Sequence, residues 1–468
     1  MPVARRWNRI RALEATLASL PEAQQAEPVH VVSFTKHAPR DARAKKREHF
    51  DVVVVGGGQA GLSVSYLLAE RGISHVVLEA QRVAHTWRSE RWDSFCLVTP
   101  NWQCQLPGHH YAGDDPHGFM LKDEIVRYVE SYAERYALPV REGVSVKRVE
   151  KMGDSGVFEV ETSDSLMTAD QVVVATGGYH TQRFPRWAKE LPSEVVPVHS
   201  AAYRNAGQLP AGQVLVVGTG QSGAQIAEDL LLAGRQVHLC VGSAPRCARK
   251  YRGRDVVDWL AEMGHYDVPI TQQSNPEDLR ERANHYVSGR GGGRDLDLRA
   301  FALLGMKLYG PAHALSHGKL RFLPELKRHL DAADDVYRSI NRSIDTYVAA
   351  QGIAAPPPSV YQSPWEPDSE PVELDLLEAG ITSAVFCTGF STDFGWVKAP
   401  VFDERGKPEH LRGVTALSGL YFIGLPWLHT WGSGRFSAVG RDALHIVEHL
   451  TSTSDKPRSE AVAFAAAP

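Results

Sequence analysis

Two short apolar runs, each followed by a glycine-rich turn, dominate the pattern of hydrophobic and polar positions along the chain. Residues 51–55 lead into GGGQAG, and residues 214–217 lead into GTGQSG. In both places a helical pattern of about 12 residues follows, and then a turn glycine and a second apolar run (HVVLEA and QVHLCVG). The pattern predicts one strand–helix–strand unit written twice.

The glycines of the two turns align without a gap. In such a unit the first glycine permits a tight turn, the second lets a pyrophosphate approach the backbone, and the third lets the helix pack closely on the sheet. The start of the helix then offers free N–H groups to the phosphates. A sharp turn without a ligand is the alternative for each copy. The expected dinucleotide contacts are Gly56, Gly58, Gln59, Ala60 and Gly61 in the first turn, and Gly218, Gly220, Gln221, Ser222 and Gly223 in the second.

The two copies differ where the second strand ends. The first ends on Glu79, whose carboxylate can accept hydrogen bonds from ribose hydroxyls, which suits FAD. The second has Val241 there, followed by Ser243, Arg246 and Arg249. A carboxylate would repel a 2′-phosphate, whereas guanidinium groups can bind it. The second copy is therefore predicted to bind NADPH through these three residues, with a solvated loop as the alternative for the arginines.

The pattern of the remaining chain completes a two-domain α/β prediction. Residues 323–353 have apolar positions at helical spacing, within an insertion over residues 250–350. Gly291 to Gly293 could hinge a lid, although a dimer interface or plain packing of the insertion is left open. The proline-rich residues 354–371 predict a linker. We expect two Rossmann-like dinucleotide-binding domains, the second inserted in the first: residues 49–205 and 372–452 for FAD, and residues 206–371 for NADPH.

Composition narrows the partners. With 51 basic and 55 acidic residues among 468, the formal net charge of -4 argues against nucleic acid as a partner. The five cysteines contain no C-x-x-C pair and no zinc-like grouping, which indicates reduced thiols in a cytoplasmic protein without a metal site. No apolar run approaches the roughly 18 residues of a membrane-spanning helix.

Both ends of the chain differ from the rest. Residues 1–20 are rich in arginine and nearly free of acids, and residues 41–48 add a second basic cluster. We expect residues 1–48 to form a poorly ordered basic tail, with a targeting or membrane-surface segment as the alternative. Residues 453–468 are expected to form a flexible C-terminal tail.

Further motifs resemble those of class B flavin monooxygenases, which carry an FAD unit followed by an NADPH unit. VVVATGGY (172–179) and VFCTGFSTD (385–393) resemble the two crossings between the domains, and GLYFIGLPWLHTWGSGRF (419–436) resembles the last FAD-domain strand with the start of the final helix. SEVVPVHSAAY (193–203) keeps His199 and Tyr203 of the monooxygenase fingerprint but has Ser193 and Val195 where the family has Phe and Gly. Residues 85–116 and 429–443 are most similar to a bacterial flavoprotein group of nitrilase-containing gene clusters.

The resemblance implies an enzyme in which NADPH reduces FAD and a flavin hydroperoxide, formed with dioxygen, oxygenates a small molecule, here expected at nitrogen. Alternatives are a Baeyer–Villiger or other NADPH-dependent flavin reaction, or a redox sensor with little turnover. A disulfide reductase is disfavoured because the paired redox cysteines are missing. A homodimer is left open.

The resemblance also implies site residues. Asn101, Trp427 and His429 are the catalytic candidates, the first through its carboxamide and the others as walls of a substrate pocket. Core packing is the alternative for the tryptophan and the histidine, and a simple turn for the asparagine. The further cofactor contacts that the resemblance implies are Trp87, Arg88, Thr176, Gly177, His199, Thr388, Gly389, Gly424, Ser433 and Arg435.

Overall fold

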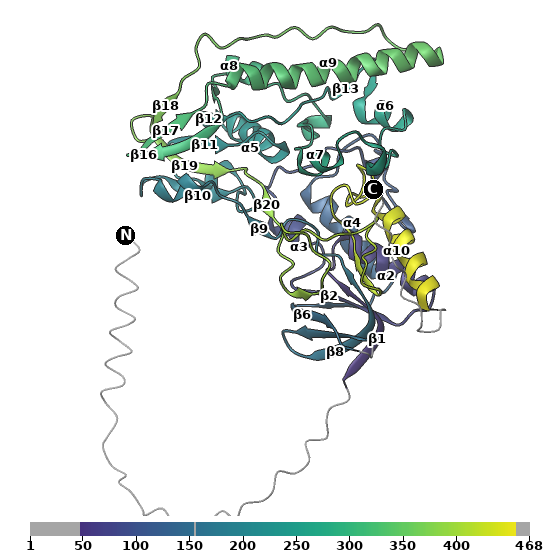
Figure 1. Ribbon diagram of the computed structural model, residues 1–468. Helices are drawn as coiled ribbons and strands as arrows, with labels where there is room; N and C mark the ends of the chain where they lie inside the picture. The colour runs from purple at the N-terminus through teal and green to yellow at the C-terminus, as the bar shows by residue number, and fades with distance from the viewer. Residues whose placement is uncertain (1–46, 154–155, 455–468) are drawn as a thin grey trace, which may run out of the picture. The chain divides into compact units, whose positions relative to one another are not determined.

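The computed structural model describes residues 47–153 and 156–454 of the chain (Figure 1). The basic tail predicted over residues 1–48 lies almost wholly outside them, and so does the C-terminal tail predicted over residues 453–468. The described residues from 47 onward belong to one compact unit.

The first of two large sheets is built around the first valine run. Its order is β21-β6-β7-β8-β1-β2-β5, and β22 also pairs with β8. The strands β5, β2, β1, β8 and β22 run parallel. Their bounds, with the remaining strands of this sheet, are β1 (Glu48–Val55), β2 (His75–Glu79), β5 (Val140–Glu142), β6 (Val146–Lys151), β7 (Phe158–Thr162), β8 (Leu166–Val174), β21 (Val397–Lys398) and β22 (Leu420–Phe422).

Both faces of β1 are buried, which explains its unbroken run of valines. Val52 and Val54 pack in a core with α2 (Gln59–Glu70), α4 (Lys122–Arg135) and α10 (Val439–Ser454). Val53 and Val55 point the other way, into a second core that contains Phe158 of β7. The central strand is therefore covered on both sides, and its carboxyl end is left to carry the glycine turn.

The second sheet repeats this plan around the second apolar run. All five strands are parallel, in the order β10-β19-β11-β12-β15. The bounds are β10 (Val196–His199), β11 (Gln213–Val217), β12 (Val237–Cys240), β15 (Lys307–Tyr309) and β19 (Ile381–Phe386), and α5 (Gln221–Leu232) follows β11. Both predicted strand–helix–strand units are thus confirmed, each with a helix of 12 residues.

The domain boundaries differ from the prediction. β10 and β19 belong to the second sheet although they lie outside residues 206–371, and β15 lies in the segment that was expected to be a helical insertion. The cause is topological, because β19 pairs directly with β11 in register Val217↔Phe386. The apolar run of β19 is far in the sequence from the other strands of this sheet. The local sequence therefore does not indicate which sheet the strand joins.

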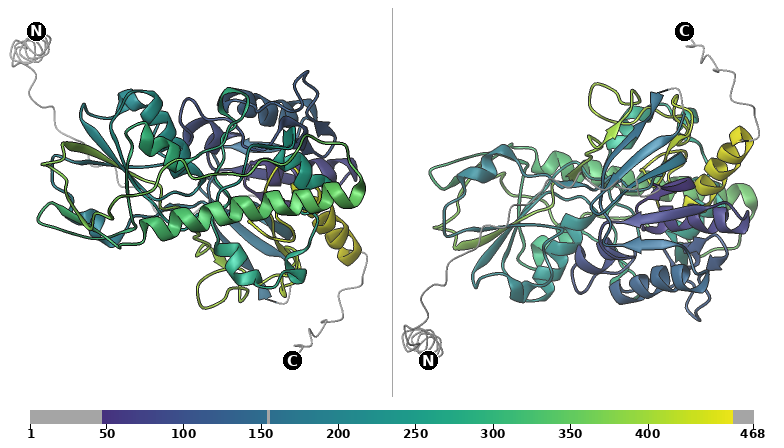
Figure 2. Two further views of the ribbon diagram at one scale, coloured as in Figure 1. Left: turned by 90° about the horizontal axis from the view of Figure 1, so that it is seen from above. Right: turned by 90° about the horizontal axis from the view of Figure 1, so that it is seen from below.

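The insertion contains both helices and strands. It comprises α6 (Val256–Glu262), α7 (Pro276–Glu281), α8 (Leu298–Leu303), α9 (Leu326–Gln351), the pair β13 (Lys250–Tyr251) and β14 (Arg254–Asp255), and the hairpin of β16 (Ala312–Ser316) and β17 (Lys319–Phe322), which pairs with β18 (Glu373–Asp375). The predicted long helix is confirmed as α9, which runs along the outside of the second sheet's half (Figures 1 and 2). Its buried positions Leu330, Tyr337, Ile344 and Val348 follow the expected spacing.

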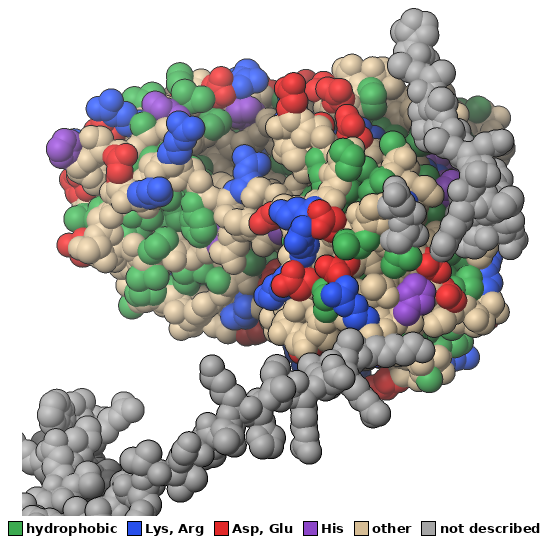
Figure 3. All heavy atoms as spheres, turned by 60° about the horizontal axis from the view of Figure 1, so that its bottom comes forward, with side chains coloured by type: hydrophobic (Ala, Val, Ile, Leu, Met, Phe, Trp, Pro, Cys, Tyr) green, Lys and Arg blue, Asp and Glu red, His purple; other side chains and the backbone are tan. Residues whose placement is uncertain are grey.

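Several short elements complete the fold. They are α3 (His85–Ser89), β3 (Gln105–Leu106), β4 (His109–His110), β9 (Thr181–Gln182) and β20 (Phe390–Ser391). The β9–β20 ladder joins the two crossing segments and lies between the sheets in Figure 1. Within the described residues, no helix has the length and apolar character needed to cross a bilayer. On the face drawn in Figure 3, basic and acidic side chains are interspersed rather than gathered by sign.

Candidate functional site

The first glycine turn leaves an open space above the start of α2. Gly56 has φ +111°, and a Cβ there would lie 2.7 Å from the carbonyl oxygen of Ala175, so only glycine fits. A Cβ on Gly61 would overlap the carbonyl oxygen of Gly56, so a glycine is needed here for the helix to lie this close to the strand. Gly58 is extended, and a Cβ there would meet nothing within 4 Å. The space that a side chain would fill is therefore free for a phosphate group.

The second turn has the same geometry. Gly218 has φ +99° and faces the carbonyl oxygen of Cys387, while a Cβ on Gly223 would overlap the carbonyl oxygen of Gly218. Gly220 is extended and open, as Gly58 is. Gln221 turns its Nε2 to the carbonyl oxygen of Val287 (2.6 Å), and Ser222 is half-buried in the first turn of α5. The two turns are thus equivalent in backbone, each at the carboxyl end of a central parallel strand.

The strand that follows each helix ends differently. Glu79 accepts hydrogen bonds from the backbone N–H of Gly57 (2.7 Å) and Gln81 (2.9 Å), so its carboxylate lies beside the first turn. At the second turn Val241 is buried, and the N–H of Gly242 donates instead to the hydroxyl of Thr219 (2.9 Å). Ser243 is exposed just beyond it. A carboxylate is thus present at the first site and absent from the equivalent place at the second.

Thr219 is a residue that the sequence reasoning missed. It aligns with Gly57, so comparing the two turns position by position would have shown a hydroxyl in place of a glycine. In the structure the Thr219 hydroxyl accepts a hydrogen bond from Gly242 and so fixes the loop after β12. At the first turn the corresponding hydrogen bond runs from Gly57 to the Glu79 carboxylate.

Three loops meet around the first turn. A Cβ on Gly424, after β22, would lie 2.9 Å from the Cβ of Ala60 and 4.0 Å from the Cα of Gly177, after β8. The Nε2 of Gln59 donates to the carbonyl oxygen of Gly434 (3.0 Å). Thr176 is exposed at the same edge. The structure therefore brings together the predicted contacts from β1, β8 and β22 at the carboxyl edge of the first sheet.

Trp87 also reaches this edge. Its Nε1 donates to the Oε1 of Gln59 (3.3 Å), and its ring stacks on Phe436 at 5.6 Å. Arg88 points elsewhere and pairs with Glu130 of α4. Ala84 has φ +60° and is buried, so it occupies a left-handed conformation that glycine would adopt at lower cost.

The loop before α10 does not form the predicted helix start. α10 begins at Val439, and the hydroxyl of Ser433 accepts hydrogen bonds from the backbone N–H of His429 (3.0 Å) and Thr430 (3.1 Å). This side chain closes a turn instead of opening a helix, because the glycine-rich residues 432–434 favour tight turns over helical backbone. Trp427 itself has φ +54°, a further sign of tight folding in this loop.

Arg435 and Trp431 connect this loop to the insertion. The guanidinium of Arg435 lies over the Trp431 ring at 4.0 Å and donates to Asn284 (2.8 Å), and Tyr266 stacks on the same ring at 4.3 Å. The backbone carbonyl of His429 accepts from Ile270 (2.7 Å). Burial lowers the pKa of the half-buried His429 imidazole. Of the two residues predicted to wall a substrate pocket, His429 therefore meets the insertion through its backbone.

His199 fastens the crossing between the two sheets. Its Nε2 donates to the carbonyl oxygen of Gly389 (3.1 Å), and its Nδ1 accepts from Ala201 (3.2 Å), a pattern that fits the neutral ring. Burial lowers its pKa accordingly. Thr388 donates to the carbonyl of Arg183 on the opposite crossing. These residues stabilise the junction, next to the second turn.

Asn101 has a structural role that differs from the prediction. Its Oδ1 accepts from the N–H of Met120 (2.7 Å) and its Nδ2 donates to the carbonyl oxygen of Asp115 (2.9 Å). The residue is 4% exposed. Both ends of the carboxamide therefore hold the loop 115–120, and the catalytic interpretation of Asn101 loses its geometric basis.

Arg246 and Arg249 are likewise not available to a 2′-phosphate. Arg246 is 2% exposed, pairs with Asp334 (2.7 Å) and stacks between two tyrosine rings. Arg249 is 1% exposed, pairs with Asp255 and donates to the carbonyl oxygen of Val98 (2.7 Å). The prediction of a phosphate-binding role is wrong for both, because partners from the insertion and the first half bury these guanidiniums.

Of the three glycines at 291–293, Gly293 is packed, whereas Gly291 and Gly292 are exposed with open space around them, so the hinge stays a prediction. A Cβ on Gly293 would lie 2.8 Å from Cδ of Arg249 and 2.8 Å from Phe119. Nearby, Asp229 of α5 accepts from Ser94 (2.5 Å), Tyr203 (2.7 Å) and Arg290 (2.8 Å). The two halves are thus joined through side chains that no local sequence motif indicates.

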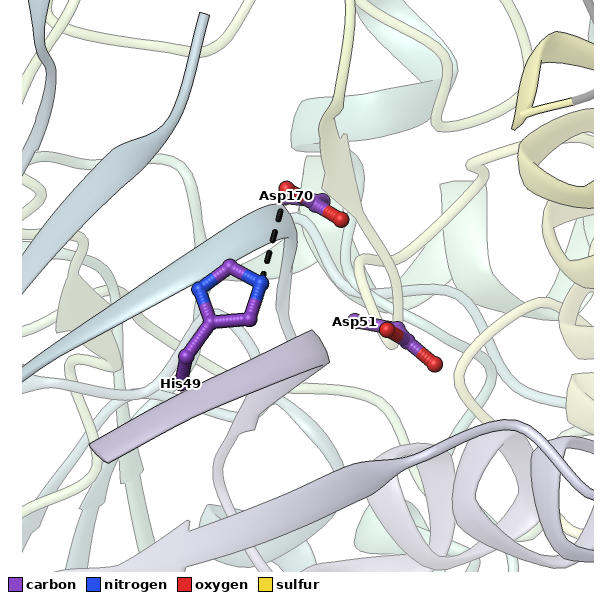
Figure 4. Close-up of side chains that lie close together, drawn as sticks. All are labelled: His49, Asp51 and Asp170. Atoms are coloured by element: carbon purple, nitrogen blue, oxygen red, sulfur yellow. Dashed lines mark ion pairs between the residues drawn. The ribbon is translucent and has the colours of Figure 1, made fainter. Parts of the chain in front are cut away.

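One group of potential metal ligands occurs among the described residues. His49, Asp51 and Asp170 lie close together on β1 and β8, with His49 3.6 Å from Asp170 (Figure 4). His49 and Asp51 lie in the amino-terminal half of β1 and Asp170 lies in the middle of β8, whereas the glycine turn follows the carboxyl end of β1. This exposed cluster is therefore remote from the candidate site and is explained as a surface ion pair.

Known proteins are similar to this chain in sequence and in architecture. The profile of a family described as pyridine nucleotide-disulphide oxidoreductase matches residues 53–287. An oxidoreductase named CzcO-like from Geobacillus kaustophilus is 31% identical over 403 residues, which span 86% of this chain and 98% of that relative. A probable indole-3-pyruvate monooxygenase from Arabidopsis thaliana, YUCCA4, is 32% identical over 192 residues, 40% of this chain and 46% of that relative.

Two solved structures show the same fold. A flavin-containing monooxygenase from Stenotrophomonas maltophilia aligns with 87% of this chain and 99% of its own, with a TM-score of 0.58 and 21% identity. A bacillithiol disulfide reductase from Staphylococcus aureus aligns with 86% of this chain and 99% of its own, with a TM-score of 0.53 and 13% identity.

Proposed function

The chain belongs to the pyridine nucleotide-disulphide oxidoreductase family and is a flavin-dependent oxidoreductase, and we propose that it is an FAD- and NADPH-dependent monooxygenase that oxygenates a small molecule at nitrogen. One observation carries the proposal. Two glycine turns of equal backbone geometry, each at the carboxyl end of a strand with parallel neighbours, occur in one compact unit. Each sheet is then a Rossmann-like dinucleotide-binding fold, one for the flavin and one for its electron donor.

The residues of the first turn fit FAD. Gly58 leaves room for a pyrophosphate at the start of α2, and the Glu79 carboxylate beside Gly57 is the group that would accept from ribose hydroxyls. Gln59 and Trp87 fix the loops that meet above the turn.

The residues of the second turn fit a nicotinamide dinucleotide. Gly220 supplies the open space, and the end of β12 carries no carboxylate that would repel a 2′-phosphate. The exposed Ser243 is the group of this loop that we assign to the 2′-phosphate in place of the buried arginines. With both cofactors bound, the pair would supply hydride transfer from NADPH to FAD and the electrons needed to activate dioxygen.

Thiol chemistry is the competing activity within the family, and the cysteines argue against it. Burial raises the pKa of the Cys96 thiol to about 11 and of the Cys104 thiol to about 12. The thiolate is the reactive form, so neither is activated at neutral pH. All five cysteines are unpaired, which fits a reducing compartment, and we propose a cytoplasmic location.

The oxygenated atom is tested by product analysis. The purified FAD-containing protein would be incubated with NADPH, isotopically labelled dioxygen and a panel of amines, nitriles and ketones, and the products analysed by mass spectrometry. A labelled hydroxylamine or N-oxide is expected. A labelled ester or lactone would show a Baeyer–Villiger reaction in place of the proposed oxygenation at nitrogen. Products without label throughout would overturn the monooxygenase proposal.

A further inference from the structure

Two half-buried arginines near the first turn lack an anionic partner. Arg91, which follows α3, donates one hydrogen bond, to the carbonyl oxygen of Glu90 (2.9 Å). Arg435, in the loop before α10, donates to the carbonyl oxygen of Trp431 and to the Oδ1 of Asn284 (2.8 Å). Within residues 47–153 and 156–454, neither guanidinium forms an ion pair with a carboxylate. Each therefore carries a charge that no acidic side chain neutralises.

Other interior arginines of this fold are satisfied. Arg249 is buried and pairs with a carboxylate. Arg204 and Arg235 are half-buried and have no carboxylate, but each donates to three backbone carbonyl oxygens. A guanidinium charge that is removed from water is unfavourable unless its N–H groups find partners. By this comparison, Arg91 and Arg435 are left with unused donors.

The unused N–H groups can be reached by a ligand. Among the residues that the structure describes, the fully enclosed side-chain nitrogens without a partner include those of Arg246 and Arg249, but none of Arg91 or Arg435. A small anion could therefore contact these two guanidiniums without opening the core.

Gln59, at the start of α2, lies between the segments that carry the two arginines. Its Oε1 accepts from the Nε1 of Trp87 (3.3 Å), and the guanidinium of Arg91 lies 5.1 Å from the ring of that tryptophan. Its Nε2 donates to the carbonyl oxygen of Gly434 (3.0 Å), the residue before Arg435. Both arginines thus belong to segments that meet at the carboxyl edge of the first sheet.

Tyr179, which follows β8, is a neighbour that both arginines share. Burial lowers the pKa of the Arg91 and Arg435 guanidiniums, and the Tyr179 hydroxyl raises the pKa of each. The Tyr179 oxygen is therefore close enough to act electrostatically on both. Its ring is exposed and packs on Phe390 of β20 at 5.2 Å. The two charges are thus near the junction of the first sheet with the crossing ladder.

The phosphates of the two dinucleotides have other positions in the proposed function. The pyrophosphates are assigned to the open spaces at Gly58 and Gly220, and the 2′-phosphate is assigned to Ser243. An anion at the two arginines would then belong to a third molecule. Guanidinium groups suit a carboxylate, because its two oxygens can accept charge-assisted hydrogen bonds from both.

We propose that Arg91 and Arg435 bind a carboxylate of the substrate, and that the substrates are therefore small molecules that carry a carboxylate besides the atom to be oxygenated. The proposal rests on the proposed function, and it assigns Arg435 to the substrate instead of the flavin. Binding of the carboxylate can be measured without turnover.

Two probes that differ in charge test the proposal. Benzoate carries a carboxylate, and benzamide has nearly the same shape without the charge. Titration calorimetry on the full FAD-containing chain is expected to show benzoate binding at least about tenfold more tightly, the ratio for a charged hydrogen bond over a neutral one. Raising the ionic strength should weaken the binding of benzoate and spare that of benzamide.

Variants locate the site. Arg91→Gln and Arg435→Gln should each weaken benzoate binding about tenfold and leave benzamide binding unchanged. Arg91→Lys keeps the charge without the planar fork and should restore part of the loss. Arg127→Gln, at an exposed arginine of α4, is the matched control and should leave both affinities unchanged.

Three results would overturn the proposal: equal affinities of the wild-type chain for the two probes, an unchanged benzoate affinity in either glutamine variant, or loss of FAD from these variants. The last result would assign the guanidinium to a flavin phosphate. NADPH affinity that falls in the variants while benzoate binding stays intact would also overturn it, in favour of a phosphate of NADPH. Flavin bleaching by NADPH is recorded on the wild-type samples, so failure of the proposed function would be seen separately.

Discussion

The two glycine turns have the same backbone and opposite side-chain arrangements. In the first, the strand end supplies the acceptor, because Glu79 receives the N–H of Gly57 (2.7 Å). In the second, the turn supplies it, because Thr219 receives the N–H of Gly242 (2.9 Å). On the proposed function, the glycines let a dinucleotide approach, and the residues around the strand end are expected to determine which dinucleotide binds.

The largest expected effect comes from filling one cradle at a time. Gly58→Trp places a ring where a phosphate would lie without a backbone clash, and FAD affinity should fall at least about ten-thousandfold, or about 5.5 kcal/mol. The purified variant should be colourless but folded by circular dichroism. Gly220→Trp is the matched control, because it should keep its yellow flavin and lose reduction by NADPH. A yellow Gly58→Trp protein would refute the assignment of the first turn.

The next largest effect concerns the buried arginines near the second site. Arg249→Ala leaves Asp255 buried without its partner and should lower the free energy of unfolding by about 3–5 kcal/mol. Its KM values for NADPH and NADH should change by the same factor. Denaturant unfolding and steady-state kinetics measure both. A stable variant in which only the KM for NADPH rises would restore the phosphate-binding role.

Smaller effects are expected when a carboxylate is removed from the first strand end or added near the second. Glu79→Gln removes the carboxylate and should weaken FAD binding about tenfold to hundredfold, as for a charged hydrogen bond of about 1.5–3 kcal/mol. Ser243→Glu introduces a carboxylate on the exposed loop after β12 and should raise the KM for NADPH about tenfold while sparing NADH. FAD titration and kinetics with both nucleotides check these outcomes. Equal effects of Ser243→Glu on the two nucleotides would argue against this loop as the 2′-phosphate site.

The smallest effect is at Ala84, which aligns with Arg246 in the second copy. Ala84→Gly removes a left-handed alanine and should raise stability by about 0.5–1 kcal/mol, seen as a higher Tm. Ala332→Gly on the exposed face of α9 is the control and should lower the stability by about the same amount. A lower Tm for Ala84→Gly would contradict the strain at this position.

Features encoded by local pattern could be predicted from the sequence. Both turns depend on glycines that the backbone itself requires, and α9 follows from apolar spacing over its whole length. The position of Glu79 beside the first glycine turn was also predictable, because the length of its strand places the strand end next to that turn. In these cases the residues that determine the structure are close together in the sequence.

Features that depend on distant partners could not be predicted. Arg246 lies 88 residues from Asp334, and only the folded insertion brings them together. Asn101 resembled a flavin contact, but the backbone of residues 115–120 satisfies its carboxamide. The strand β19 joins the second sheet after a long excursion, which moved the domain boundary. The role of a charged or polar residue next to a motif can therefore be assigned only when its long-range partners are known.

The central claim is that one chain holds a flavin at the first turn and admits its electron donor at the second. Anaerobic mixing of the purified FAD-containing protein with NADPH tests it most directly. The account predicts that the flavin absorbance bleaches with NADPH and that Gly220→Trp abolishes the bleaching. A flavin that stays oxidised with NADPH, yet is bleached by dithionite, would contradict the account.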